Sequence, residues 1–562
     1  MGAKAVVACG GGVMLERGVA CRLSDGTVLL SDHYYPSGEG PWPTLLMRQP
    51  YGRDIASTVV YAHPVWFARR GYNVVIQDVR GRGGSGGEFY PFRNEGRDGV
   101  ETIAWLRTRP ESNGRVGMYG FSYQGMTQLL AAAEQPEGLE CIAPAMTACD
   151  LYTGWFYHNG ALRLASSLGW GVQMLKEDAV RLGLHEARAQ LEAAWMNLRA
   201  QMWTMPYAEH VAIADVALPG YVRDWFEHDT AGEYWSAMDV STRAAKIKVP
   251  ALHVSGWYDT YLEGSVRGFE LLRSHAGSDH ARQNQYLLAG PWVHIPWGDR
   301  VGESDLGAAA RMDTDELLLR WFDHWLKDTG SFADEPKVRH FAMGANAWFA
   351  ADDWRGDATK VFYLHSGGRA ESRKGDGLLS AETAGEESPD VFVYDPEVPV
   401  LSPVVSGPSD QAALEMGNNL LVYTSEPLVQ SLHVLGAPKV EVYASTSASH
   451  ADVVAKLVRV MPSGRAEFAC IGIARSTYLF GDAYEADAVQ RWEFELEPTS
   501  TVFAAGDCVR LEIAGGAFPL YDRNPSNATK PRAMTPWNWG RSTHTVFHDE
   551  ARRSALVLQV TR

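Results

Sequence analysis

A strand, a tight turn and a helix follow one another in a short stretch of the chain, and this unit constrains the fold most strongly. Val116–Tyr119 (VGMY) has a β-rich composition, and Met126–Glu134 (MTQLLAAAE) is a good helix former. Small residues at Gly120 and Gly125 permit a sharp turn and a close approach of the helix to the strand. The pattern therefore predicts that the hydroxyl of Ser122 projects from a strand-to-helix turn.

Strand-like and helix-like runs alternate around this unit, from about Gly18 to Ala148. β-rich runs stand at Thr44–Arg48 and Tyr72–Gln77, and a helical run follows at Gly99–Arg107. The same alternation resumes later, with strand-like Lys248–Ser255 and Gln285–Ala289 and an amphipathic helix at Asp315–Leu326. Such alternation is typical of a mostly parallel sheet covered by helices.

Two other segments have a different character. Between Leu151 and about Val240, apolar residues recur at helical spacing, namely Leu184, Leu191, Trp195 and Leu198. After about Pro336, short β-rich runs are separated by Gly, Pro and Asp: Asp390–Tyr394, Leu420–Thr424, Lys439–Tyr443, Val453–Val460, Trp492–Leu496 and Val509–Ile513. We predict an α/β core in residues 14–150 and 241–335, a helical insertion in 151–240, and a β-sandwich or jelly roll in 336–562.

Composition and charge exclude several classes of protein. The 562 residues carry a net charge of −17, and no stripe of Lys and Arg indicates a nucleic-acid partner. No apolar run approaches the ~20 residues that cross a bilayer, and Met1–Val13 lacks the pattern of a secretion signal. Cysteines occur without metal-ligand spacing or a disulfide framework, at Cys9, Cys21, Cys141, Cys149, Cys470 and Cys508. We expect a cytoplasmic protein that contacts no membrane.

Two serines compete for the role of nucleophile. The literal pattern G-x-S-x-G occurs around Ser85, whereas the turn around Ser122 has Gln124 where the second glycine is expected. A nucleophilic serine must stand between a strand and a helix. Ser85 lies in a run of glycines followed by Glu-Phe-Tyr-Pro, which cannot begin a helix, so the context favours Ser122.

A serine hydroxyl attacks a carbonyl only when a histidine accepts its proton and a carboxylate orients that histidine. In α/β-hydrolases these residues follow in the order Ser, Asp or Glu, His. Asp259 comes after a late strand-like run, and His294 comes after the next one, so both have the predicted order and place. The alternatives lie within a strand or helix pattern or in the wrong order: His253, His324, Asp78, Asp98, Asp299 and Asp305.

At these residues the chain resembles the cocaine esterase group of bacterial acyl hydrolases, which is related to α-amino acid ester hydrolases and X-Pro dipeptidyl-peptidases. The resemblance covers nearly the whole chain. Its motifs are RQPYGR at Arg48–Arg53, DVRGRGGSGGEF at Asp78–Phe89, GMYGFSYQG at Gly117–Gly125, SGWYDTYLEGS at Ser255–Ser265, GPWVH around His294, LRWFDHWLK at Leu319–Lys327 and FPLYDRNP at Phe518–Pro525. It implies an α/β-hydrolase fold, in which the helical insertion is a cap and the C-terminal domain is a jelly roll.

The resemblance also implies roles for particular residues. Ser122, Asp259 and His294 match the family's catalytic triad. The hydroxyl of Tyr51 and the backbone N–H of Tyr123 match its oxyanion hole. Aromatic residues similar to those that hold the acyl group are Trp155 or Phe156, Trp170, and Tyr261, where the family often has phenylalanine. The extra hydroxyl of Tyr261 suggests a more polar acyl group, and for each of these aromatics plain core packing is the alternative.

The sequence thus predicts a serine hydrolase that cleaves small-molecule esters, or amides, and needs no metal or organic cofactor. An α-amino acid ester hydrolase or acylase, or an X-Pro dipeptidyl-peptidase, is the first alternative, and it would need carboxylates that bind a substrate ammonium. A non-catalytic carbohydrate-binding protein that uses the β domain is the alternative from another class. The physiological substrate and the oligomeric state stay open, with a homodimer as one option.

Overall fold

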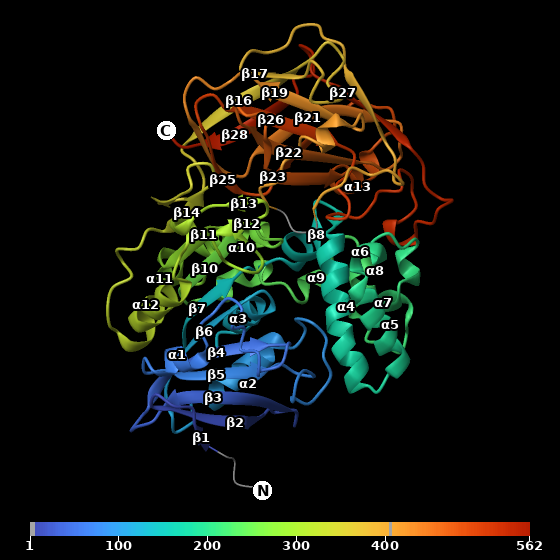
Figure 1. The fold of residues 1–562 in the computed structure, drawn as a ribbon. Helices are drawn as coiled ribbons and strands as arrows, with labels where there is room; N and C mark the ends of the chain where they lie inside the picture. Colours follow the sequence, from blue (N-terminus) through green and yellow to red (C-terminus); the bar gives the residue numbers. More distant parts are fainter. Residues whose placement is uncertain (1–5, 404–406) are drawn as a thin grey trace.

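The computed structural model describes residues 6–403 and 407–562, and its first half is built on one large twisted sheet (Figure 1). Eleven strands of the described chain pair in the order β1-β2-β3-β5-β4-β6-β7-β10-β11-β14-β15. From β5 to β14 all neighbours are parallel. The strands are β1 Val6–Ala8, β2 Val13–Arg22, β3 Val28–Pro36, β4 Trp42–Gln49, β5 Asn73–Asp78, β6 Ser112–Phe121, β7 Leu139–Ala145, β10 Ala251–Tyr258, β11 Gln285–Val293, β14 Val338–Ala342 and β15 Ala347–Ala351.

Helices cover both faces of this sheet because its central strands are apolar on both sides. Leu45 and Leu46 are neighbours on β4 and are both fully buried, yet they belong to different hydrophobic clusters. Successive side chains of a strand point to opposite faces, so each cluster fills one face. The helices are α1 Pro64–Ala68, α2 Glu95–Leu106, α3 Tyr123–Ala133, α10 Leu262–His275, α11 Asp279–Gln283 and α12 Thr314–Lys327. The α/β fold class is therefore confirmed.

The chain between β7 and β10 is mainly helical and lies beside the sheet, on the right in Figure 1. Its strands β8 (Tyr157–His158) and β9 (Ala161–Leu162) pair only with each other. The helices are the π-helical turn η1 Tyr152–Phe156, α4 Leu164–Arg181, α5 His185–Met196, α6 Leu198–Gln201, η2 Tyr207–Glu209, α7 Val211–Ala214, α8 Tyr221–Glu227, α9 Glu233–Ser236 and η3 Ser241–Lys246. Leu191 faces the core, whereas Trp195 is 39% exposed, so the helical period did not identify a buried face throughout.

The C-terminal part of the chain forms the predicted all-β jelly-roll domain, at the top of Figure 1. Each of the six β-rich runs coincides with a strand, and further strands complete the domain. The strands are β16 Ala358–His365, β17 Leu378–Ser380, β18 Asp390–Tyr394, β19 Leu420–Ser425, β20 Leu432–Gly436, β21 Lys439–Thr446, β22 Asp452–Val460, β23 Ala466–Arg475, β24 Gln490–Glu495, β25 Thr499–Phe503, β26 Cys508–Ala514, β27 Ser542–Phe547 and β28 Ala555–Val560. The short elements η4 Ala308–Ala310, β12 Arg300–Val301, β13 Ser304–Asp305, η5 Leu414–Met416, α13 Ser476–Leu479, η6 Gly481–Ala483 and η7 Pro531–Ala533 lie in connections.

The first sheet extends further along the chain than the sequence predicts. β14 and β15 follow residue 336, but β14 pairs in parallel with β11, and β15 pairs with β14. Their hydrogen bonds cover the edge of β11, which would otherwise be open to solvent. The predicted boundary between residues 335 and 336 therefore falls before the end of the first sheet, and the second sheet begins with β16.

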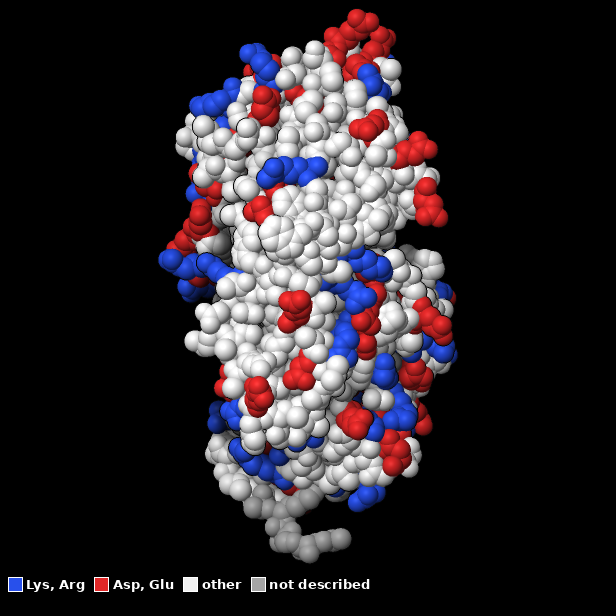
Figure 2. Space-filling model, turned by 90° about the vertical axis from the view of Figure 1, so that its right-hand side faces the viewer, with Lys and Arg blue, Asp and Glu red and all other residues white. Residues whose placement is uncertain are grey.

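The surface carries charges of both signs. On the face that Figure 2 shows, Lys and Arg are interspersed with Asp and Glu and form no continuous basic patch. In the part of the chain that the structure describes, no helix is both long and apolar enough to cross a membrane.

Candidate active site

Ser122 lies at the turn between β6 and α3, in the middle of the sheet. Its backbone has φ 62° and ψ −127°, a conformation that residues other than glycine rarely adopt. Two glycines make the turn possible. A Cβ on Gly120, at φ +135°, would lie 2.5 Å from the Cβ of Gln124, and a Cβ on Gly125 would lie 2.6 Å from the Cβ of Thr147. The sharp turn and the close approach of α3 to the sheet thus have a steric origin.

Gln124, the departure from the usual pattern, holds this turn together. Its side-chain oxygen accepts a hydrogen bond from the backbone N–H of Phe121 at 3.1 Å. Its side-chain nitrogen donates to the hydroxyl of Ser57 at 2.5 Å. The glutamine therefore connects the turn to the loop after β4, a contact that a glycine could not make.

Asp259 and His294 follow the ends of two adjacent parallel strands, β10 and β11. The carboxyl ends of parallel strands meet at one edge of a sheet, which brings both residues to the edge where Ser122 lies. The Nδ1 atom of His294 is 2.7 Å from Oδ1 of Asp259, whose side chain is buried. This contact occupies one ring nitrogen and leaves Nε2 for another partner.

Ser122 and His294 open into the same cavity, which has a volume of about 390 Å³. Tyr51, Trp170 and Tyr261 also line it. The other lining residues are Ile55, Ser57, Val59, Phe121, Ala165, Ser166, Gly169, Gln173, Trp195, Leu198, Thr260 and Ile295. No Asp, Glu, Lys or Arg belongs to this wall in the described ranges, so His294 is its only titratable side chain besides the two tyrosines.

The two predicted oxyanion donors both neighbour the serine: Tyr51 contacts its side chain, and Tyr123 follows it in the chain. Burial raises the pKa of Tyr51 to about 12, against smaller opposing effects of the neighbouring Trp170 and Ser122 side chains, so its hydroxyl keeps its proton. Tyr123 is the first residue of α3, and the N–H groups in the first turn of a helix have no partner within that helix. Its phenol points elsewhere and donates to Glu95 Oε1 at 2.7 Å.

The aromatic residues predicted to contact substrate divide into two groups. Trp170 and Tyr261 line the cavity, but Trp155 and Phe156 do not. Trp155 lies behind Tyr261 and stacks on it at 4.1 Å between ring centroids. Phe156 is fully buried against Trp225 and Trp235 and packs in the core.

The sequence reasoning missed several residues of the cavity wall. Trp195 and Leu198 come from the ends of two cap helices, and Ile55 and Val59 come from the loop after β4. The spacing of Trp195 along the sequence predicts a place on an apolar helix face. A helical period does not distinguish a residue that packs into a core from one that lines a cavity.

Ser85, the literal match to the motif, has a structural role. Its hydroxyl donates to the backbone oxygen of Asp78 at 2.7 Å and accepts from the N–H of Leu30 at 2.9 Å. The first contact ties the loop to the end of β5, and the second ties it to β3. Ser85 is 2% exposed and does not line the cavity of Ser122.

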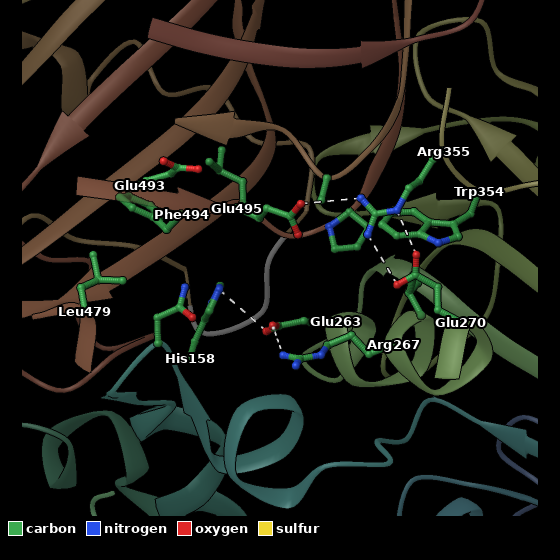
Figure 3. Close-up of a pocket in the computed structure, with 15 residues that line it drawn as sticks. His158, Glu263, Arg267, Glu270, Trp354, Arg355, Leu479, Glu493, Phe494 and Glu495 are labelled. Atoms are coloured by element: carbon green, nitrogen blue, oxygen red, sulfur yellow. Dashed lines mark hydrogen bonds and ion pairs between the residues drawn. The ribbon is translucent and has the colours of Figure 1, made fainter. Parts of the chain in front are cut away.

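A second cavity, of about 330 Å³, lies between α10, the β8–β9 connection and β24 (Figure 3). Each charged side chain in its wall takes part in an ion pair, including Arg355 with Glu270 and Arg267 with Glu263. His158, which also lines it, binds the hydroxyl of Tyr521 at 2.7 Å. Among the described residues, this wall has no serine or cysteine that could act as a comparable nucleophile.

The fold, the strand-to-helix turn and the Asp–His pair define a serine hydrolase of the α/β-hydrolase class. Models of two families match the chain: the X-Pro dipeptidyl-peptidase (S15 family) over residues 25–296, and the X-Pro dipeptidyl-peptidase C-terminal non-catalytic domain over residues 330–557. Cocaine esterase of Rhodococcus sp. (strain MB1 Bresler) is 33% identical over 541 residues, which cover 92% of this chain and 93% of that protein. The chain belongs to the S15 family, in its cocaine esterase-like branch.

Solved structures agree with this fold. An aminopeptidase from a marine sediment Thaumarchaeota archaeon has a TM-score of 0.81 at 24% identity, and the match covers 98% of this chain and 97% of that one. An α-amino acid ester hydrolase has a TM-score of 0.80 at 24% identity and covers 99% and 98%. At these identities the similarity shows a common fold, and the choice of substrate depends on the cavity itself.

Proposed function

We propose that this protein hydrolyses neutral carboxylic esters by two-step acyl transfer on Ser122. His294 accepts the serine proton through Nε2 while Asp259 holds its Nδ1, and the serine oxygen attacks the ester carbonyl. The oxyanion binds the hydroxyl of Tyr51 and the N–H of Tyr123. His294 then protonates the leaving alcohol, and water repeats the sequence on the acyl-enzyme.

One observation carries this proposal: the strained Ser122 opens into the same uncharged cavity as a histidine that is bound to a buried aspartate. Cocaine esterase, a relative over nearly the full length, is an esterase by name. The absence of carboxylates from the described cavity wall disfavours a substrate ammonium, which an amino acid ester or a dipeptide would carry. An ester hydrolase therefore ranks above an α-amino acid ester hydrolase and an X-Pro dipeptidyl-peptidase.

The test compares Ser122→Ala with Ser85→Ala on 4-nitrophenyl esters. Ser122→Ala should lower kcat by about 10⁴-fold or more, because the nucleophile is lost. Ser85→Ala is the matched control and should keep near-wild-type kcat in its folded fraction. A fluorophosphonate probe should label the wild type and the control but not Ser122→Ala. Activity retained by Ser122→Ala would refute the assignment.

A panel of substrates separates the alternatives. Phenylacetyl and benzoyl esters should be cleaved faster than phenylglycine methyl ester or an Ala-Pro anilide. The opposite order would favour the aminopeptidase-like activities. A cytoplasmic location remains part of the proposal and is supported by the six cysteines, which are all free thiols. A homodimer remains a prediction that gel filtration tests.

A further inference from the structure

Tyr261 is held rigidly beside the proposed catalytic histidine. It precedes α10 and stands two residues after Asp259. One ring face stacks on Trp155 at 4.1 Å between centroids and 25° between planes. The ring also meets His294 edge-to-face at 5.2 Å and 83°. Because Trp155 is itself buried, this stack fixes the position of the phenol before any substrate binds.

The hydroxyl of Tyr261 has no hydrogen-bond partner in the described chain, although the residue is only 6% exposed. The hydroxyl oxygen of Tyr261 is accessible, whereas that of Tyr119 is enclosed and has no partner. The residue lines the cavity, so the oxygen faces the cavity space. Burial raises the pKa of Tyr261 well above its ordinary value, with Asp259 and Tyr51 adding to the effect, so the group is a proton donor.

The position of Tyr261 favours contact with the acyl half of the substrate. Large apolar residues at the edge of the cavity are exposed: Ile55 53%, Val59 57% and Ile295 45%. The leaving alcohol must depart through this open edge while the acyl group remains on Ser122. The buried wall that contains Tyr261 therefore surrounds the part of the substrate that stays.

A purely apolar acyl group would remove water from this hydroxyl and give it no partner. Leaving a buried donor unpaired costs more than a typical hydrogen bond gains. The uncharged wall provides no counter-charge for an ionic group, so a neutral oxygen or nitrogen acceptor fits best. Building on the proposed esterase function, we infer that Tyr261 selects esters whose acyl group carries a neutral hydrogen-bond acceptor near the carbonyl.

The experiment compares wild type and Tyr261→Phe on pairs of 4-nitrophenyl esters that differ by one atom. Methoxyacetate is paired with butanoate, and phenoxyacetate with 3-phenylpropanoate, so that an ether oxygen replaces a methylene. The ratio of kcat/KM values, oxygen over methylene, should fall about threefold to tenfold in Tyr261→Phe, the range for one neutral hydrogen bond. Comparing ratios between enzymes cancels the intrinsic reactivity of each ester.

Tyr478→Phe, at an exposed tyrosine of α13, is the matched control and should keep the wild-type ratio. Phenylalanine preserves the stack on Trp155, so Tyr261→Phe should fold with an unchanged Tm. An unchanged ratio in an active Tyr261→Phe enzyme would overturn the inference. The inference would also be overturned if Tyr261→Phe changed the oxygen-over-methylene ratio only for the alcohol part of the substrate. Esters of one acid with 2-methoxyethanol and with butanol measure that ratio. Failure of the esterase proposal itself would show separately, as activity in Ser122→Ala.

Discussion

At the scale of the residue, the surroundings fix the backbone of Ser122 and the protonation state of Tyr51. Ser122 has a left-handed backbone conformation, which costs about 1–3 kcal/mol and persists only because β6 and α3 fix both sides of the turn. Tyr51 keeps its phenol protonated within a buried wall. In the proposed mechanism, both groups are arranged in advance for a charge that develops only during the reaction.

Tyr51→Phe tests the oxyanion donor. The substitution keeps the ring and removes only the hydroxyl that faces Ser122. We expect kcat to fall about 10²–10³-fold with little change in KM, because the hydrogen bond strengthens in the transition state. Steady-state assays over a range of 4-nitrophenyl acetate concentrations measure kcat and KM. A rise in KM at constant kcat would instead assign Tyr51 to ground-state binding.

At the scale of the element, the junction of β6, α3 and β7 sets the height of the nucleophile above the sheet. The N–H of Ser122 donates to the backbone oxygen of Ala145 at 2.8 Å, which ties the turn to the end of β7. Gly125 packs directly on Thr147, just beyond that strand. The helix can approach this closely only because residue 125 has no side chain.

Gly125→Ala should therefore push α3 away from Thr147. Its Cβ would be 2.6 Å from the Cβ of that residue, a contact that neither backbone can relieve without shifting. We expect a loss of about 1–3 kcal/mol in stability, together with a lower kcat. Urea unfolding and steady-state kinetics measure the two effects. Gly38→Ala is the control, because no atom of the described chain lies within 4 Å of a Cβ at that position. It should change neither the stability nor kcat.

At the scale of the whole molecule, buried polar contacts join the cap, the core and the β domain. Arg163 precedes α4 and is 1% exposed. It donates to Glu497 of the β domain at 2.8 Å and to Glu263 of α10 at 3.2 Å. Backbone bonds between Met343 and β25 add a second connection. The three parts therefore support one another, and the catalytic domain is not an independent body.

Arg163→Ala should destabilise the protein by about 3–5 kcal/mol, because the buried Glu497 loses the charge of Arg163. Glu263 keeps its ion pair with Arg267. Differential scanning calorimetry should also show separation of the β-domain transition from that of the core. The control is Arg188→Ala, which removes an exposed pair with Glu192 at 2.9 Å. That change should cost less than about 0.5 kcal/mol. Equal effects of both variants would contradict the role of the buried contact.

The β domain contains its own buried charge, Asp390. Burial alone would raise its pKa, but hydrogen bonds from His548, the Ala370 N–H, Ser366 and Tyr423 together lower it. A carboxylate with a lowered pKa stabilises the folded state above its unfolded pKa of about 3.9, and this contribution is lost as the pH falls through the folded value. Asp390→Asn should thus be less stable than wild type at pH 7, by about 1–3 kcal/mol. The difference should shrink below about pH 4, as urea midpoints across pH would show.

The sequence by itself determined the local chemistry of this protein. The sequence predicts the strand, turn and helix around Ser122, because these elements depend on neighbours in the chain. It also gives the order of Asp259 and His294 after two strand-like runs. The six β-rich runs of the C-terminal domain were readable for the same reason. The antiparallel strands β2 and β3 and the strands β14 and β15 were missed. β3 joins the sheet through β5, and β14 joins it through β11, so their place in the sheet depends on residues distant in sequence.

Only the tertiary structure decided which aromatic residues face the substrate space. The sequence predicts the same role for the aromatic residues Trp155 and Tyr261. In the fold, Trp155 stacks behind Tyr261, and of the two only Tyr261 lines the cavity. Trp195 follows a helical period but lines the cavity from the cap. A wall built from six separate segments has no signature in any one of them, because direction and burial are fixed only when the segments pack.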